Sequence, residues 1–109
     1  MPRQRRSRAP AGDPAAPDPA RLRLEPRLDL GAASALVEGL LVARGRDLAL
    51  DAAEVRFLGG PGLQVLLAAH RSWADGGRAL SVEDPSEAFL EGLARLGATI
   101  DVITVERAT

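Results

Sequence analysis

The 109-residue sequence contains no cysteine, no lysine and no tyrosine, and it has only one histidine. The lack of cysteine excludes disulfide bonds, thiol catalysis and thiolate metal sites. A single histidine cannot form the multi-histidine ligand sets that are common in zinc sites. The formal net charge is -1, and this near-neutrality argues against nucleic-acid binding by the folded part of the chain.

Long hydrophobic runs are also missing. No apolar stretch approaches the roughly 20 residues that a membrane-spanning helix requires, and the arginines near the N-terminus are not followed by the apolar segment of a secretory signal. We therefore expect a cytoplasmic protein that does not insert into a membrane. The length fits one domain, which buries only about 60–65% of its unfolded surface and so has one modest core and no deep cleft.

Residues 1–20 differ in composition from the rest of the chain. They are rich in arginine, proline and alanine, and they contain no large apolar residue after Met1. Such a segment cannot compensate for the loss of its own conformational entropy. We predict a disordered tail over residues 1–20 and one folded domain over residues 21–109. A second interpretation stays open, in which the arginines form a basic arm that contacts nucleic acid, anionic lipid or an acidic partner.

From residue 21 onward, hydrophobic periodicity predicts alternating strands and helices. Two short strands separated by Pro26 come first. A helix follows, with Asp29 as its N-cap and Gly45 as its C-terminal glycine. The later elements are a strand buried on both faces over residues 48–50, a helix over 63–75, a strand over 79–82, a helix that opens at 84–87 with Asp84 as its N-cap, and a final strand over 100–105.

The order of these elements, ββαβαβαβ, predicts an α/β domain with a mixed, mostly parallel sheet and helices packed on it. Each helix has an apolar stripe that we expect to face the sheet. In the second helix this stripe includes His70 and Trp73, so we expect both to be packed. The stripes of the first and third helices are Ala33, Leu36, Val37, Leu40 and Leu41, and Phe89, Leu90, Leu93 and Leu96.

The second helix is preceded by a turn of three glycines and one proline, Gly59-Gly60-Pro61-Gly62. A turn that leads into a helix presents unpaired backbone N–H groups and the positive end of the helix dipole. In parallel sheets, the loops at the carboxyl ends of the strands meet ligands and partners. This turn lacks the spacing of a phosphate-binding loop or a dinucleotide fingerprint, and the chain has no lysine to reach a phosphate. We therefore predict that this turn is the functional tip of a small binding domain.

Other groups that could carry chemistry have simpler structural explanations. His70 could be a general base or a metal ligand, but a lone histidine on an apolar stripe is more often a packed residue. Asp51, Glu83 and Asp84 could meet near the strand ends and act as acid–base groups, although Asp84 already has a role as a cap. No serine lies on a sharp turn, as a serine triad would require. We predict no catalytic residue, no metal and no cofactor.

Three stretches of the sequence resemble the STAS domain family, the anti-sigma factor antagonists and their relatives. They are LDL before an alanine-rich helix, LALDAAEVRFLGGPGLQVLLAAH, and DPSEAFLEGLARLG. The likeness extends from about Arg21 to Val105. It implies a small α/β protein without catalytic activity that docks onto a protein partner, often a kinase that also sequesters a sigma factor.

In typical antagonists of this family, the turn carries an aspartate, two serines, a glycine and a leucine, and the second serine is phosphorylated. Alignment on Gly62-Leu63 places Pro61 at the phosphorylated position. Phosphate adds about −1.5 to −2 charges and disrupts docking, but proline has no hydroxyl, so the resemblance implies docking without this switch. The partner-binding residues that it implies are Asp29, Gly59, Gly60, Pro61, Gly62, Leu63 and Gln64.

Three functions remain open at this point. The leading prediction is a STAS adaptor in bacterial signalling, which binds an anti-sigma factor or kinase, or belongs to a histidine-kinase or chemotaxis assembly. The second is a STAS subunit that braces a lipid-transport ATPase. The third is a small-molecule or nucleotide-binding domain, which a thermal-shift screen with nucleotides would test.

Overall fold

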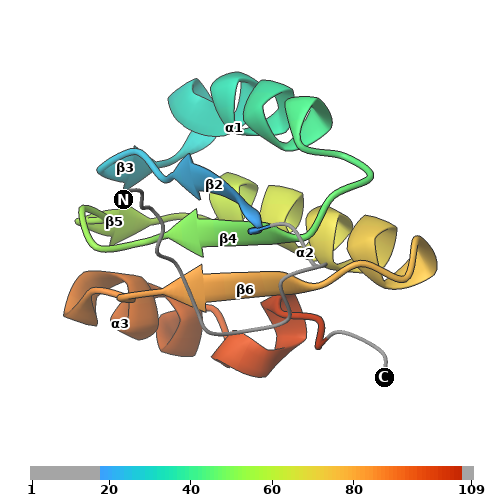
Figure 1. Ribbon diagram of the computed structural model, residues 1–109. Helices are drawn as coiled ribbons and strands as arrows, with labels where there is room; N and C mark the ends of the chain where they lie inside the picture. Colours follow the sequence, from blue (N-terminus) through green and yellow to red (C-terminus); the bar gives the residue numbers. More distant parts are fainter. Residues whose placement is uncertain (1–17, 107–109) are drawn as a thin grey trace, which may run out of the picture.

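A computed structural model describes residues 18–106 and shows an α/β domain in which every named strand pair is parallel (Figure 1). The predicted fold class is therefore confirmed. The elements in chain order are β2 (Ala20–Arg23), β3 (Arg27–Leu28), α1 (Leu30–Val42), β4 (Leu48–Asp51), β5 (Phe57–Leu58), α2 (Gly60–Asp75), β6 (Leu80–Glu83), α3 (Glu87–Arg95) and the 3-10 helix η1 (Ile100–Ile103).

The strands form two small sheets. The first has the order β2-β4-β6, and the second contains only β3 and β5, in which Leu28 lies opposite Leu58. Pro26 separates β2 from β3, as predicted, and its carbonyl oxygen accepts hydrogen bonds from the N–H groups of Arg56 (2.7 Å) and Phe57 (3.1 Å). This pairing holds β5 beside β3. Strand β5 is followed directly by the turn Gly59-Gly60-Pro61-Gly62, which we call the glycine turn.

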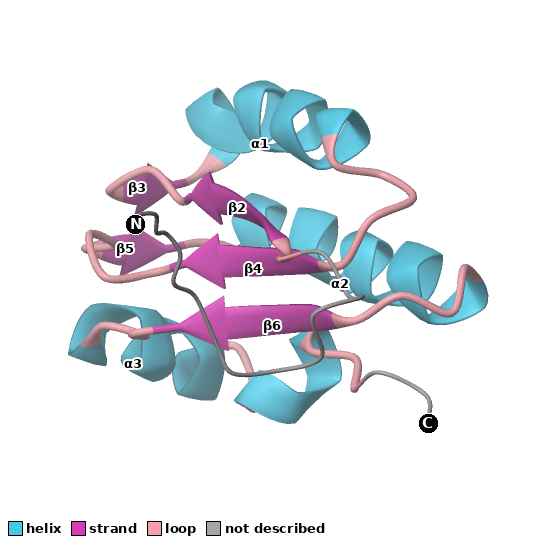
Figure 2. Cartoon of the chain, viewed as in Figure 1, coloured by secondary structure: helices cyan, strands magenta, loops and turns pink. Residues whose placement is uncertain are grey.

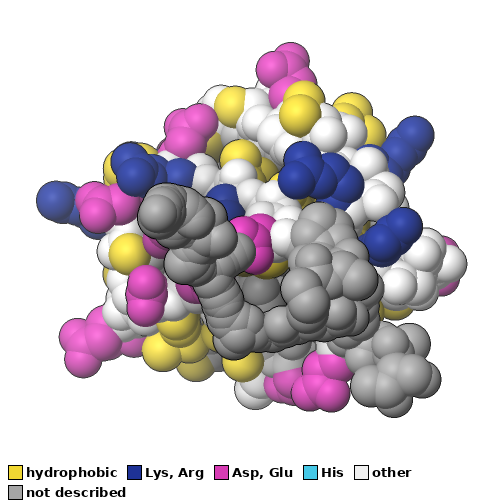
Figure 3. Space-filling view, in the orientation of Figure 1, with side chains coloured by type: hydrophobic (Ala, Val, Ile, Leu, Met, Phe, Trp, Pro, Cys, Tyr) yellow, Lys and Arg dark blue, Asp and Glu magenta, His cyan; other side chains and the backbone are white. Residues whose placement is uncertain are grey.

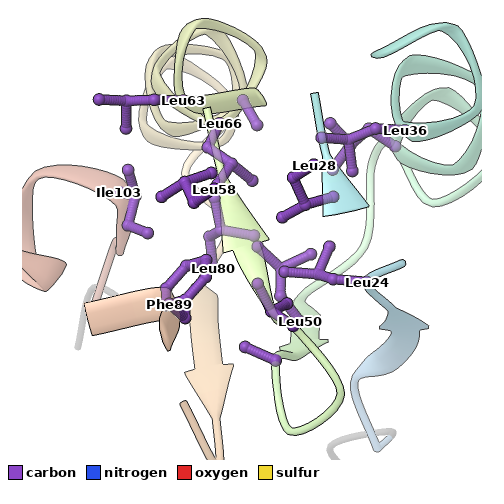
Figure 4. Packing of buried hydrophobic residues seen from close by; sticks show 14 of the residues in the cluster. Leu24, Leu28, Leu36, Leu50, Leu58, Leu63, Leu66, Leu80, Phe89 and Ile103 are labelled. Carbon is purple, nitrogen blue, oxygen red and sulfur yellow. The ribbon is translucent and has the colours of Figure 1, made fainter. Parts of the chain in front are cut away.

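One hydrophobic core lies between the sheets and the helices. Helix α2 crosses behind the strands in Figure 2, while α1 lies along one edge of the sheet and α3 and η1 along the other. Leu48, Ala49 and Leu50 of β4 are each at most 1% exposed, as predicted for a strand buried on both faces. Figure 4 shows the strand leucines converging with Leu66 of α2 and Phe89 of α3, which are both fully buried.

The last predicted strand is not formed. Residues 100–103 form η1, and only Val105 makes an antiparallel bridge, to Leu80. A short apolar run does not distinguish a strand from a helical turn by its periodicity, and here the turn places Ile103 in the core with no exposed surface. The Thr99 hydroxyl donates to the Asp101 carboxylate, and this bond lowers the pKa of Asp101 below its ordinary value.

The N-cap of α3 is Ser86, whereas the sequence predicted Asp84. The Ser86 hydroxyl accepts a hydrogen bond from the N–H of Phe89 (3.0 Å) and donates one to the carbonyl oxygen of Val55 (2.6 Å). Asp84 has a φ of 51°, in the left-handed region, whereas an N-cap residue is normally extended. Gly45 has a φ of 89° and follows the end of α1, as predicted.

Helices α1 and α3 bury a narrower stripe than the sequence predicted. In α1, Leu36 and Leu40 are buried, but Val37 is 40% exposed and Leu41 is 55% exposed. In α3, Phe89 and Leu93 are buried, whereas Leu90 and Leu96 remain exposed. The reason is that each helix packs on few elements: α1 lies mainly against α2 and β3, and α3 lies mainly against β5. Only the strip of each helix that faces these neighbours is buried.

The folded domain begins no later than Ala20. This residue starts β2, and its N–H donates to the carbonyl oxygen of Asp47 (2.8 Å). The strand therefore starts one residue before the predicted domain boundary at residue 21. Residues 1–17 of the predicted tail lie outside the described residues.

We expect that deletion of residues 1–17 leaves the midpoint of thermal unfolding almost unchanged. After Met1, the first large apolar side chain is that of Leu22, so the deletion removes no other residue of the kind that forms the core. Calorimetry on the full and the shortened chain tests this. A fall of more than a few degrees would show that the N-terminal segment packs on the domain.

Candidate functional site

The glycine turn joins β5 to α2 and forms the first turn of that helix. Gly59 is the N-cap, in an extended conformation and without a side-chain cap. Its carbonyl oxygen accepts the N–H of Leu63 (3.0 Å), and its own N–H donates to the carbonyl oxygen of Leu28 (2.9 Å). The first N–H groups of a helix have no partner within the helix. This end of α2 therefore presents hydrogen-bond donors and the positive end of the helix dipole.

Part of the turn is buried inside the domain. A Cβ on Gly62 would lie 2.5 Å from the carbonyl oxygen of Leu28 and 2.9 Å from its Cβ. Only glycine therefore lets α2 approach β3 this closely. Gly59 is also buried, and Leu63 is 6% exposed and belongs to the core. These three predicted partner-binding residues hold the turn in place and offer little surface to a partner.

Gly60, Pro61 and Gln64 form the outward part of the turn, and we call these three residues the docking tip. Pro61 and Gln64 are exposed. Nothing lies within 4 Å of a Cβ built on Gly60. The predicted site therefore separates into a buried part that fixes the backbone and a tip that a partner can reach.

Asp29 lies at the same end of the domain as the docking tip, because it follows Leu28, which contacts the turn. Its Oδ1 accepts a hydrogen bond from the N–H of Ala32 (3.3 Å), which confirms the predicted N-cap of α1. Its Oδ2 pairs with Nε of Arg27 (3.3 Å). The carboxylate is partly exposed, so it can still meet a partner that covers the tip.

A basic aromatic cluster lies beside the turn and was not predicted from the sequence. The guanidinium carbon of Arg27 lies 4.7 Å from the centre of the Phe57 ring, and that of Arg95 lies 5.9 Å from it. Such cation–π contacts hold both arginines at this end of the domain. Phe57 lies in β5 and Arg95 ends α3, so no local sequence pattern could have revealed their contact.

Two of the three carboxylates considered for acid–base chemistry, Asp51 and Glu83, have structural partners. Asp51 Oδ1 accepts a hydrogen bond from the N–H of Ala53 (3.0 Å), and Glu83 forms an ion pair with Arg21. In the part of the chain that the structure describes, no three His, Cys, Asp or Glu residues are grouped so that they could hold a metal ion. The same part contains no helix with the length and apolarity needed to cross a membrane.

Trp73 and His70 both face the packed side of α2, but they differ in burial. Trp73 is 4% exposed, and its Nε1–H donates to the carbonyl oxygen of Arg46 (2.8 Å), so its predicted core role is confirmed. His70 is only partly buried, and its Nδ1 is buried without a hydrogen-bond partner. Within residues 18–106, His70 belongs to no group of three His, Cys, Asp or Glu residues that could hold a metal ion.

We expect His70→Leu to raise the free energy of unfolding by about 1 kcal/mol, because it removes a buried nitrogen that makes no hydrogen bond. His70→Gln is the matched control, since it keeps a polar group and should give no such gain. Urea unfolding measures both variants. Partner binding should stay within a few-fold of wild type, and its loss in a folded variant would instead make His70 a functional residue.

A comparison with protein families gives a match over nearly the whole chain. The model of the family described as "Mlab, STAS domain" matches residues 11–104, which include every helix and strand from β2 to η1. No curated protein matches the chain, and no solved structure does. STAS domains are generally protein-interaction modules.

Proposed function

Because this chain belongs to the STAS domain family, we propose that it is a non-catalytic module that docks onto a protein partner through the docking tip. One observation carries this proposal, the division of the turn into two parts. Gly59, Gly62 and Leu63 are buried and fix the backbone, while the docking tip faces outward at the start of α2. A rigid backbone that presents a small exposed surface suits docking, because little conformational entropy is lost on binding.

The charges around the tip indicate which partner surface would fit. The helix N-terminus is electropositive, and Arg27 and Arg95 lie over Phe57 beside it. Of these two arginines, within the described residues, only Arg27 has its charge offset, by its pair with Asp29. Carboxylates or backbone carbonyl oxygens on the partner would complement these groups. We therefore expect the partner to present an acidic or carbonyl-rich pocket to the tip.

Docking through this tip would be constitutive. Pro61 is exposed in the first turn of α2, and the alignment on Gly62-Leu63 assigns it to the position of the phosphorylated serine in typical antagonists. Proline suits the first turn of a helix because its missing N–H has no helical acceptor there. A side chain without a hydroxyl cannot be phosphorylated, so the charge that releases an antagonist from its partner cannot be added at this position.

Two settings suit a module of this kind. One is the signalling adaptor, with an anti-sigma factor, a kinase or a chemotaxis assembly as its partner. The other is a STAS subunit that braces a lipid-transport ATPase. The missing hydroxyl favours the second setting, since a permanently assembled subunit needs no phosphate switch.

A pull-down from the native host with two baits would test the proposal. The baits are the wild-type chain and the folded variant Pro61→Asp, and quantitative mass spectrometry compares the captured proteins. We expect one partner to be enriched on wild type and depleted on the variant. An ATPase would support the transport setting, and a kinase or anti-sigma factor would support the signalling setting. Equal capture by both baits would contradict docking through the tip.

A further inference from the structure

An apolar groove between α1 and α2 is separate from the docking tip. It has a volume of about 170 Å³ and is lined mainly by apolar side chains. Val37 and Leu41 form its α1 wall, Val65 and Ala68 form its α2 wall, and Trp73 lies at its base. We propose that this groove binds an amphipathic helix of a protein partner, which runs antiparallel to α1 and α2 and places an acidic first turn at Arg44.

The exposed face of α1 extends the groove into a longer apolar line. Leu30, Val37 and Leu41 follow the spacing i, i+7 and i+11, so they lie along one side of α1, and Arg44, in the turn after the helix, lines the groove beyond them. Leu30 is 76% exposed, Val37 40% and Leu41 55%, and hydrophobic side chains are visible at the surface over α1 in Figure 3. This line is about 20 Å long, which matches about four turns of a partner helix.

The arginines at one end of the groove fix the direction of that helix. Arg44 and Arg78 border a second cavity of about 340 Å³, which adjoins the groove and shares Ser72 and Trp73 with it. Within residues 18–106, neither arginine forms an ion pair. Helices α1 and α2 run in the same direction and both end on this side (Figure 1). An antiparallel helix would place its positive N-terminus there, and acidic residues in its first turn would both stabilise it and pair with the arginines.

Two other occupants fit these observations less well. Residues 2–19 have no large apolar side chain, so the N-terminal segment cannot supply an apolar stripe. A second copy whose α1 lay in the groove in this antiparallel direction would place the N-terminus of that helix at Arg44. The first turn of α1 has no acidic residue, and its N-cap Asp29 already pairs with Arg27, so Arg44 would face a positive helix end without a carboxylate to pair with. The helix of a different protein can carry acidic residues in its first turn.

The test uses a display library of 16-residue helical peptides, with apolar residues at the heptad a and d positions, no tryptophan and random residues elsewhere. The full chain serves as the target, and the fluorescence of Trp73, its only tryptophan, reports binding of each selected peptide. We expect the selected peptides to carry Asp or Glu in their first turn. Leu41→Glu should weaken their binding about ten-fold or more. Arg44→Glu should have a similar effect that shrinks at high salt.

Val42→Glu is the matched control. Val42 is 86% exposed and adjacent to Leu41, but it does not line the groove, so we expect binding to stay within about two-fold of wild type. Selection of no binder, or of peptides without acidic first turns, would overturn the proposal. Light scattering gives the oligomeric state of the chain. If the wild type is a dimer and Leu41→Glu is a monomer, the groove binds a second copy of the chain, and the proposal is overturned. Pro61→Asp should leave peptide binding unchanged, so the proposal for the groove and the proposal for the docking tip are tested independently.

Discussion

Replacement of Gly62 by alanine should lower the free energy of unfolding by about 3 kcal/mol, at the upper end of the range for a methyl group forced into a packed site. The added Cβ would lie 2.5 Å from the carbonyl oxygen of Leu28. That oxygen already accepts the hydrogen bond from the N–H of Gly59, so β3 cannot move away without straining this bond. For a domain of this size, the loss corresponds to a fall of roughly 10–20 °C in the unfolding midpoint.

Gly60→Ala provides the control for this prediction. Gly60 lies two residues earlier in the same turn, nothing lies within 4 Å of a Cβ at this position, and its φ is not positive. Alanine is a better helix former than glycine, so we expect a gain of about 0.5 kcal/mol. Guanidinium unfolding of the two variants gives the comparison. If both glycines tolerate alanine equally, the close approach of α2 to β3 is not a packing constraint.

The sequence predicted those parts of the fold in which local patterns and packing agree. Pro26 separates two strands, Asp29 caps α1, and the apolar run of β4 is buried on both faces, all as predicted. Each of these features depends on a few adjacent residues. The STAS resemblance added the family, which the family comparison confirms, and the alignment of Pro61 with the phosphorylated serine of typical antagonists.

The sequence could not predict features that arise from contacts between distant segments. Ser86 caps α3 in place of Asp84 because its hydroxyl also reaches the carbonyl oxygen of Val55, 31 residues away. The cation–π contacts of Phe57 join residues from β3, β5 and α3. In the glycine turn, the composition does not show that Gly62 faces Leu28 while Gly60 faces outward. Only the structure separates the docking tip from the residues that support it.

Pro61→Asp should weaken binding of the partner by about thirty- to a thousand-fold, or about 2–4 kcal/mol, because it buries an unpaired charge in the interface. The fold should tolerate the change, since Pro61 is exposed and an acidic residue suits the first turn of a helix. Pro61→Ser adds a hydroxyl without a charge, so it should bind nearly as well as wild type. Circular dichroism on each variant would establish that it is folded before its affinity is measured.

Isothermal titration of the captured partner into wild type, Pro61→Asp and Ala74→Asp tests docking through the tip most directly. Ala74 is also exposed on α2, about 20 Å along the helix from Pro61, so it receives the same charge far from the tip. We predict that Ala74→Asp binds within a few-fold of wild type and that Pro61→Asp loses at least thirty-fold in affinity, a loss of about 2 kcal/mol. Unchanged binding of Pro61→Asp, or an equal loss in both variants, would contradict the assignment of Gly60, Pro61 and Gln64 as the docking tip.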